Sequence, residues 1–223
     1  SDYRPYVAGD DLRNLDWGDS KAKFTGMIAW RGTIPMEKLP PHMSRRVATN
    51  WVGPGAHAVC YPLRGGRIMN FVATVERDDW TLESWSTQGT TEECLADFAG
   101  WHDDIQTMIR NAPSLFKWAL CGRPPMEAWT TNRITLLGDA CHSTLPFLAQ
   151  GAVMALEDAV ILGRCMEKYR DDLPSALQRY EALRLGVTTR KVLGASANTE
   201  RFHNPALATE AGAQADVDKE WTR

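Results

Sequence analysis

The stretch Arg133-Ile-Thr-Leu-Leu-Gly-Asp-Ala-Cys-His-Ser-Thr-Leu-Pro-Phe-Leu-Ala-Gln-Gly-Ala-Val-Met-Ala-Leu-Glu-Asp-Ala159 carries more structural information than any other part of the chain. Its apolar start, Ile134 to Leu137, predicts a buried strand, and Gly138-Asp139 predicts a turn at the end of that strand. A loop holding Pro146 follows, and Gly151-Ala152 predicts the start of a long helix. A carboxylate then faces a helix N-terminus, whose free N–H groups favour anionic or carbonyl-rich ligands. In open α/β sheets this crevice is where cofactors bind.

The order of residues in this stretch resembles the second FAD fingerprint of the single-component FAD-dependent aromatic hydroxylases, the salicylate, 3-hydroxybenzoate and 6-hydroxynicotinate hydroxylase type. The resemblance implies that Gly138 and Asp139 form the turn that holds hydroxyls of the flavin's ribityl or ribose group. It also implies that the following loop and helix start lie against the isoalloxazine ring, through Pro146, Ala149, Gln150, Gly151 and Ala152. Backbone N–H groups there suit the negative charge that builds on the reduced ring. Ala149 departs from the commoner family wording, and a methyl is tolerable where the contacts are made by the backbone.

The ADP-binding half of such an enzyme has no counterpart in this sequence. No Gly-x-Gly-x-x-Gly stands between a strand and a helix, because Gly53/Gly55 and Gly65/Gly66 lie between strand-like runs. The resemblance covers roughly residues 20 to 205. We therefore expect the C-terminal part of a longer enzyme, with the N-terminal FAD-binding segment in the parent chain, and we expect the fragment alone to be inactive and to hold FAD weakly or not at all.

Composition limits the other functional classes. The charge of −3 and the pI near 6.0 give no electrostatic case for nucleic acid or an anionic membrane. No apolar run approaches the roughly 18 residues that span a bilayer. The five cysteines are widely spaced and never form Cys-x-x-Cys, which suits reduced thiols in a cytoplasm better than a disulfide framework or a zinc site. We therefore expect a cytoplasmic protein without a metal.

The first half of the chain favours strands. We expect strands over 24–34, 56–63 and 67–75, with Arg64-Gly-Gly as a hairpin turn and Pro62 at an edge or strand end. Residues 80–86 are a further candidate strand, and Phe116 to Cys121 another. Together they predict a mixed or antiparallel sheet that is covered on one face.

The helices are signalled by their caps. Thr90-Thr-Glu-Glu93 forms a capping box for a short helix to about Phe98, and a second helix spans roughly 103–111. Residues 150–169 are expected to be helical, with an apolar face of Val153, Leu156, Val160 and Leu162. Asp171-Asp-Leu-Pro174 starts a helix that reaches about Phe202.

The fold class expected is α/β (α+β), a PHBH-like flavoprotein monooxygenase fold lacking its N-terminal Rossmann half, with an antiparallel substrate-binding sheet and C-terminal helices. The expected organisation is the end of the first FAD-domain segment (1–20), a substrate-binding β-sheet domain with two short helices (21–125), the second FAD-binding segment (126–170), a C-terminal helix (171–205) and a frayed tail (206–223).

His57 and Tyr61 are the candidate catalytic side chains. On a strand, residues i and i+4 share a face, about 13 Å apart at the backbone, so both rings can point into one cavity. A histidine titrating near neutrality suits the removal of a phenol proton, which makes the ring electron-rich for oxygen attack. The run His-x-x-x-Tyr-Pro also resembles the substrate-site strand of 3-hydroxybenzoate hydroxylases. A core histidine with an aromatic neighbour explains the pair equally well. Pro146 joins the catalytic set because the resemblance places its carbonyl near the substrate ring.

Other polar residues favour structural roles. His142 is expected to make a structural hydrogen bond, Cys141 to be packed, and Glu157 and Asp158 to pair with arginines. Arg31 is compatible with carboxylate binding, but a structural salt bridge is favoured. Arg64, Arg67, Arg184, Arg190 and Lys191 are expected on solvated faces.

These features predict an FAD-dependent, NAD(P)H-consuming monooxygenase that hydroxylates a small aromatic acid with O₂. NADH and NADPH are both open as co-substrate, and a homodimer is possible. Two alternatives stay open: a flavin oxidoreductase acting on a non-phenolic substrate, and a non-catalytic FAD-domain remnant that serves as a binding module.

Overall fold

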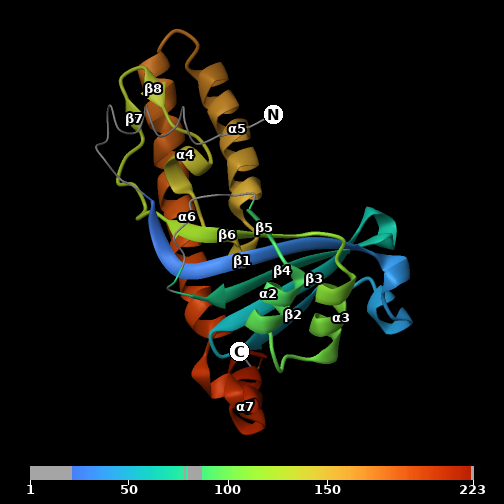
Figure 1. Cartoon of the computed structure of the whole chain (residues 1–223). Coiled ribbons are helices and arrows are strands. Elements are labelled where there is room, and N and C mark those ends of the chain that lie inside the picture. Colours follow the sequence, from blue (N-terminus) through green and yellow to red (C-terminus); the bar gives the residue numbers. More distant parts are fainter. Residues whose placement is uncertain (1–21, 78, 80–86, 222–223) are drawn as a thin grey trace. The chain divides into compact units, whose positions relative to one another are not determined.

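The computed structural model describes residues 22–77, 79 and 87–221, and the chain divides into two compact units (Figure 1). Of the described residues, the sheet unit contains those of 24–120 and 200–221, and the helical unit contains 121–199 with residues 22 and 23. The elements of the first half are β1 (Lys23–Pro35), η1 (Met36–Lys38), η2 (Pro41–Ser44), β2 (Thr49–Gly53), β3 (Ala56–Leu63), η3 (Arg64–Gly66), β4 (Ile68–Glu76), β5 (Thr87–Gly89), α2 (Thr91–Asp97), α3 (Asp103–Asn111) and β6 (Leu115–Gly122). Those of the second half are β7 (Thr130–Thr131), β8 (Ile134–Thr135), α4 (Asp139–His142), η4 (Pro146–Leu148), α5 (Gly151–Lys168), α6 (Leu173–Phe202), η5 (Pro205–Ala208) and α7 (Glu210–Trp221).

The sheet unit is built on a six-stranded sheet with the order β2-β3-β4-β1-β6-β5. Its β2–β3, β3–β4, β1–β4 and β5–β6 pairings are antiparallel. The predicted hairpin is confirmed: β3 and β4 pair from Ala56↔Val75 to Leu63↔Ile68, and Arg64, Gly65 and Gly66 all have positive φ in the turn. Pro62 lies beyond Cys60, where the pairing with β2 ends, so it disturbs no β2 hydrogen bond.

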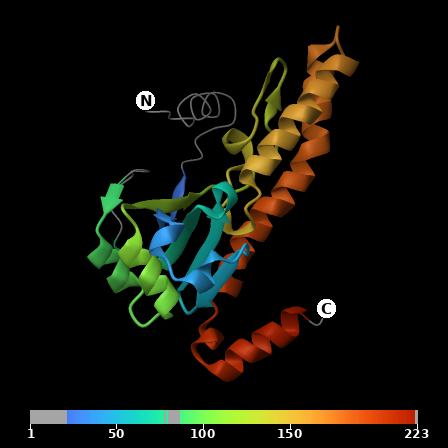
Figure 2. The same ribbon diagram turned by 90° about the vertical axis from the view of Figure 1, so that its right-hand side faces the viewer.

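One face of the sheet is covered by α2 and α3, as predicted (Figures 1 and 2). Ile28, Trp30, Ala58 and Phe71 of the strands share one buried cluster with the helix residues Cys94, Phe98, Ile105, Met108 and Ile109. Because side chains alternate along a strand, the intervening residues His57, Val59 and Tyr61 point to the other face. The covered face is therefore the core of this unit, and the opposite face carries the polar candidates.

The predicted helix starts are confirmed in atomic detail. Thr90 and Glu93 make both hydrogen bonds of a capping box at the start of α2. Asp172 accepts from the backbone N–H of Ser175 at 3.2 Å, at the start of α6, which ends at Phe202 as predicted. No helix among the described residues combines the length and hydropathy needed to cross a membrane.

Several sequence predictions were wrong. Residues 134–137 form no buried strand: β8 has only two residues, pairs only with β7 in a separate ribbon, and leaves Ile134 38% exposed. A short apolar run identifies a strand only if a sheet partner exists, and that is not a local property. The expected frayed tail contains η5 and α7. The candidate strand over 80–86 lies outside the described residues, and β5 begins directly after it.

Gly89 of β5 provides a test of this packing. A Cβ at this position would lie 2.2 Å from Cζ3 of the fully buried Trp30, whose indole N–H donates to Asp97 at 2.8 Å and cannot easily move. We predict that Gly89→Ala lowers the free energy of unfolding by about 1–3 kcal/mol, measured by urea denaturation. The control is Gly163→Ala in α5, where a Cβ meets nothing within 4 Å; it should raise stability by about 0.5–1 kcal/mol. An equal effect of both substitutions would contradict the packing.

Candidate functional site

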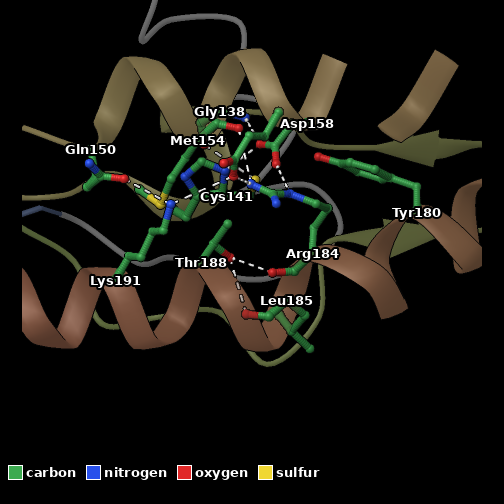
Figure 3. A network of polar contacts seen from close by, with 12 residues as sticks. Gly138, Cys141, Gln150, Met154, Asp158, Tyr180, Arg184, Leu185, Thr188 and Lys191 are labelled. Carbon is green, nitrogen blue, oxygen red and sulfur yellow. Dashed lines mark hydrogen bonds and ion pairs between the residues drawn. The ribbon is translucent and has the colours of Figure 1, made fainter. Parts of the chain in front are cut away.

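The carboxylate of Asp158 organises the Gly138-Asp139 turn. Asp158 is fully buried on α5 and accepts from Arg184 Nε of α6 at 2.6 Å. Its other oxygen lies 2.5 Å from Nε2 of His142 and accepts from the backbone N–H of Gly138 at 3.2 Å. Figure 3 shows this network between α5, α6 and the turn. One side chain therefore joins the turn, α4 and both long helices.

These contacts agree with the structural roles that the sequence predicted for several polar residues. His142 is buried and bonded to Asp158, and Glu157 accepts from Arg184 at 2.8 Å, so both structural predictions are confirmed. Cys141 is buried, with its thiol 3.4 Å from the carbonyl oxygen of Gly138. The thiol, imidazole and carboxylate lie within 4.8 Å of one another, a spacing that a metal ion could use. The Arg184 guanidinium already occupies the carboxylate and would repel a cation, so we assign the cluster to hydrogen bonding.

The charge state of Asp158 follows from its partners. Burial by itself raises the pKa of a carboxyl, but the hydrogen bonds from His142 and Arg184 outweigh it and hold the pKa of Asp158 below its ordinary value. The same pairing raises the pKa of Arg184 against the effect of burial. Asp158 is therefore ionised at neutral pH, and its contribution to stability is lost only as the pH falls below the ordinary carboxyl range.

Three residues of α6, spaced seven apart, hold the loop before α5 and the first turn of α5. Arg184 also donates to the Met154 carbonyl oxygen at 3.3 Å, Lys191 donates to Oε1 of Gln150 at 2.9 Å, and Asn198 donates to the Phe147 carbonyl oxygen at 3.1 Å. Seven residues are close to two helical turns, so the three side chains lie on one face of α6. The prediction that Arg184 and Lys191 lie on solvated faces was wrong.

The phase of α5 also differs from the prediction. Val153, Leu156 and Val160 are 42%, 69% and 54% exposed, whereas Met154, Asp158 and Cys165 are buried. Three of the four residues of the predicted apolar face therefore point outward, because the buried face of the helix is selected by the charged network of Asp158. The fourth, Leu162, is half-buried and packs against the core cluster of the helical unit.

Asp139 is exposed at the start of α4, and among the described residues its carboxylate makes no hydrogen bond or ion pair. Gly138 before it has φ 63°, ψ −138°, and a Cβ there would lie 3.2 Å from Cβ of Ala155, so the turn runs close against α5. The turn places a free carboxylate at the surface of the helical unit.

The start of α5 is the second part of the predicted cofactor site. Pro146 begins η4 and is exposed, and Ala149 adopts the left-handed conformation (φ 51°, ψ 31°) that residues other than glycine rarely take. Gln150 is the N-cap residue, and no side chain caps the helix. The N–H groups of the first turn, including those of Gly151 and Ala152, therefore have no helical acceptor. A free carboxylate for ribose or ribityl hydroxyls and uncapped N–H groups for a carbonyl edge fit the donors and acceptors of FAD.

The two predicted catalytic side chains, His57 and Tyr61, lie on the same face of β3, but their surroundings differ. Tyr61 is 38% exposed and lines a shallow cavity of about 320 Å³ together with Arg46, Pro62, Gly65 and Gly66. His57 is 3% exposed and does not line that cavity. Its Nδ1 lies 2.7 Å from Nε2 of His203, and its ring packs against Phe202. Burial, and then the neighbouring His203, lower the pKa of His57 to about 3, so its ring is neutral near pH 7.

Arg31 belongs to the same face of the sheet. Arg31 and Val59 both pair with Val72, and Val59 lies between His57 and Tyr61 on β3. Arg31 is exposed, and its guanidinium lies 5.5 Å from the ring centroid of Trp118, a cation–π contact. No carboxylate of the described chain pairs with it, so the structural salt bridge expected from the sequence is not found there. His203 was missed altogether, because nothing in its local sequence indicates a contact with a strand 146 residues away.

Comparison with known proteins places this geometry in context. The model of the family described as "FAD binding domain" matches residues 34–194. A 3-amino-4-hydroxybenzoate 2-monooxygenase of Streptomyces platensis is 37% identical over 174 residues, which cover 78% of this chain and 44% of that protein. A 3-hydroxybenzoate 6-hydroxylase of Polaromonas naphthalenivorans is 36% identical, covering 83% of this chain and 46% of that protein. The chain therefore spans about half the length of the curated relatives it matches. A salicylate hydroxylase structure has a TM-score of 0.78 at 24% identity, covering 95% of this chain and 57% of that one, so the fold is shared.

Asp158 and Glu157 give a paired test of the network. Asp158→Asn leaves the buried Arg184 guanidinium without its main counter-charge, so we predict a loss of about 3–5 kcal/mol in the free energy of unfolding. Glu157→Gln removes a partner that is 42% exposed, and it should cost less than about 1 kcal/mol. Chemical denaturation at pH 7 measures both. If Asp158→Asn lowers the free energy of unfolding no more than Glu157→Gln does, the Asp158 carboxylate does not organise the turn.

Proposed function

Because the chain belongs to the FAD-binding-domain family that includes the aromatic-ring hydroxylases, we propose that the protein carrying it is an FAD-dependent monooxygenase that hydroxylates a small aromatic acid. The relatives act on hydroxylated or amino-hydroxylated benzoates, according to their names. The proposal applies to the whole protein, since this chain spans less than half of those relatives. NADH or NADPH is the proposed source of electrons and O₂ the source of oxygen.

The observation that carries the proposal is the free carboxylate of Asp139, held by the buried Asp158 network near the uncapped start of α5. Asp139 would accept hydrogen bonds from ribityl or ribose hydroxyls. The backbone N–H groups of Gly151 and Ala152 would donate to the carbonyl edge of the ring, where a helix N-terminus stabilises negative charge. The backbone path of this loop is determined by four further residues, Gly138, Pro146, Ala149 and Gln150. When bound, FAD supplies the oxygen chemistry.

Two side chains on the sheet face opposite α2 and α3 support a carboxylated aromatic substrate. Arg31 offers a guanidinium without a carboxylate partner in the described chain, beside the flat ring of Trp118. A guanidinium binds a carboxylate through two parallel hydrogen bonds, and an indole offers a surface for an aromatic ring. We assign Arg31 to the substrate carboxylate, in place of the structural role that the sequence favoured.

His57 is the proposed base for the phenol proton. A neutral imidazole has a lone pair to accept it, and loss of the proton raises the electron density of the ring that is to be hydroxylated. Tyr61 is the proposed hydrogen-bond partner for a polar substituent of the substrate, and the Pro146 carbonyl the proposed acceptor near the ring. Each of these roles follows from the resemblance and from side-chain chemistry.

The flavin role of Asp139 is tested by cofactor content. We predict that Asp139→Ala in the whole protein weakens FAD binding about 10- to 100-fold, the effect of removing a charged hydrogen-bond acceptor. FAD absorbance per protein and a titration of the apoprotein with FAD measure it. Asp171→Ala is the matched control, because Asp171 is also an exposed carboxylate of the helical unit without a partner in the described chain. Full retention of FAD by the Asp139 variant would refute the proposed role of Asp139 in FAD binding.

The substrate class is tested at Arg31. We predict that Arg31→Gln raises the KM for hydroxybenzoates about 10- to 100-fold while the KM for the corresponding phenols without a carboxylate stays within about twofold. NAD(P)H oxidation with identification of the hydroxylated product is the readout, and it also separates hydroxylation from futile NAD(P)H oxidation. The exposed Arg45 provides the control substitution, Arg45→Gln. Equal losses on acids and phenols would remove Arg31 from carboxylate recognition.

A further inference from the structure

The shallow cavity beside Tyr61 lies where β2 begins and β3 ends. Apart from the two glycines of the β3–β4 turn, its lining residues are Arg46, Val47, Ala48, Tyr61 and Pro62. The pairing of β2 with β3 stops at Thr49↔Cys60, so the segment before Thr49 is not paired with β3. Pro62 has no N–H with which the pairing could continue. The cavity therefore follows from the way in which this edge of the sheet ends.

Arg46 gives the cavity a positive charge. Its side chain is exposed and pairs with no carboxylate of the described chain. Its backbone is held in a tight turn, because the N–H of Val47 donates to the Arg45 carbonyl oxygen at 2.9 Å. Arg64 and Arg67, on either side of the two lining glycines, are also exposed and without a carboxylate partner in the part of the chain that the structure describes. Three guanidinium groups thus make this end of the sheet attractive to anions, on a chain whose net charge is −3.

The other walls of the cavity suit an aromatic ring. Tyr61 is 38% exposed, and Val47 is 47% exposed. A guanidinium binds a carboxylate through two parallel hydrogen bonds, and a tyrosine offers the flat surface of its ring. Arg46 and Tyr61 therefore offer the same two groups as Arg31 and Trp118, namely a guanidinium without a carboxylate partner in the described chain and an aromatic surface.

Tyr61 lies between Arg46 and Arg31. The strand order places β2 on one side of the β3–β4 pair and β1 on the other. Tyr61 pairs with Asn70 of β4, and Arg31 pairs with Val72, two residues further along that strand. The backbones of Tyr61 and Arg31 are therefore about 12 Å apart, from two strand spacings and two residues. The cavity and the proposed substrate site at Arg31 are two places on the sheet, one on each side of Tyr61.

The form of the cavity suits binding better than reaction. It is shallow, so a ligand inside it stays in contact with water. Transfer of oxygen to an aromatic ring needs a site from which water is excluded. A surface site with a positive charge instead raises the local concentration of an anionic substrate.

We propose that this cavity is a second binding site for the aromatic acid. Arg46 captures the carboxylate there, and the ring lies against Tyr61, before the acid moves to Arg31. No covalent bond is made or broken at this site. The inference rests on the proposed function, since it takes the same class of acid as the substrate.

Binding stoichiometry tests the second site without turnover. Calorimetric titration of the whole protein, with FAD bound and NAD(P)H absent, should find two sites per chain for 3-hydroxybenzoate. Arg46→Gln should weaken one of them about 10- to 100-fold, the effect of losing charged hydrogen bonds, and Arg31→Gln should weaken the other. Arg45→Gln is the control, because Arg45 is an exposed neighbour that does not line the cavity, and it should keep both sites. Two unchanged sites in Arg46→Gln would overturn the proposal.

A cavity-filling variant tests the place of binding while the charge is kept. Ala48→Phe puts a ring into the cavity and leaves Arg46 intact, so it should remove the same site as Arg46→Gln. Ala99→Phe is the matched control, because Ala99 is an exposed alanine of the sheet unit outside the cavity. Full binding at both sites in Ala48→Phe would show that the acid is not held in this cavity.

Steady-state kinetics separate capture from catalysis. Arg46→Gln should lower kcat/KM for hydroxybenzoates about 10-fold, because electrostatic attraction is lost, and should leave kcat within about twofold. Added salt should lower the kcat/KM of the unsubstituted protein toward that of the variant, since it screens the attraction. Arg46→Lys keeps the charge and should keep most of the kcat/KM. A fall in kcat as large as that in kcat/KM would overturn the capture role.

The outcomes also separate this inference from the proposed function. A single site that only Arg31→Gln weakens, together with normal formation of hydroxylated product, would leave the proposed function standing and overturn the second site. Absence of hydroxylated product from every aromatic acid would overturn the proposed function, and with it the capture of a substrate at Arg46.

Discussion

The helical unit depends on one buried negative charge. Asp158 has no solvent contact, yet three donors from three different segments compensate it: the Gly138 N–H, His142 and Arg184. A buried carboxylate is tolerated only when its hydrogen-bonding capacity is satisfied, so these segments must come together for the unit to fold. The consequence for the surface is that Asp139, one residue after Gly138, is held outward in a fixed place. The position of Asp139, the proposed cofactor contact, thus follows from the buried ion pair between Asp158 and Arg184.

The sequence was sufficient to predict those features that depend on contacts between residues close together in the chain. The Thr90–Glu93 capping box, the Gly65-Gly66 turn and the start of α6 at Asp172 each involve atoms within a few residues, and each was predicted from a few letters. The residues of the FAD fingerprint were found by their order along the chain, and their roles stay predictions. The antiparallel sheet followed from three strand-like runs and one glycine turn.

The predictions failed where the deciding partner was distant in sequence. The outward-facing apolar stripe of α5 looked like a core face, because periodicity reports which residues share a face and not which face is buried. Arg184 determines the buried face, 26 residues after Asp158. Likewise, the sequence favoured an ion pair for Arg31, whereas the structure places its guanidinium over Trp118 of β6 and pairs it with no carboxylate of the described chain. His203 could not be linked to His57 from the sequence, since the contact exists only once α6 ends beside the sheet.

Burial disfavours the charged form of both Asp158 and His57, and their different partners decide the charge state of each. Asp158 stays charged because a guanidinium and an imidazole stabilise its ionised form more than burial destabilises it. His57 stays neutral because burial disfavours the imidazolium form, and the neighbouring His203 lowers its pKa further. A permanent charge suits a structural centre, which must not change with pH. A neutral ring with a lone pair suits the proton uptake proposed for His57.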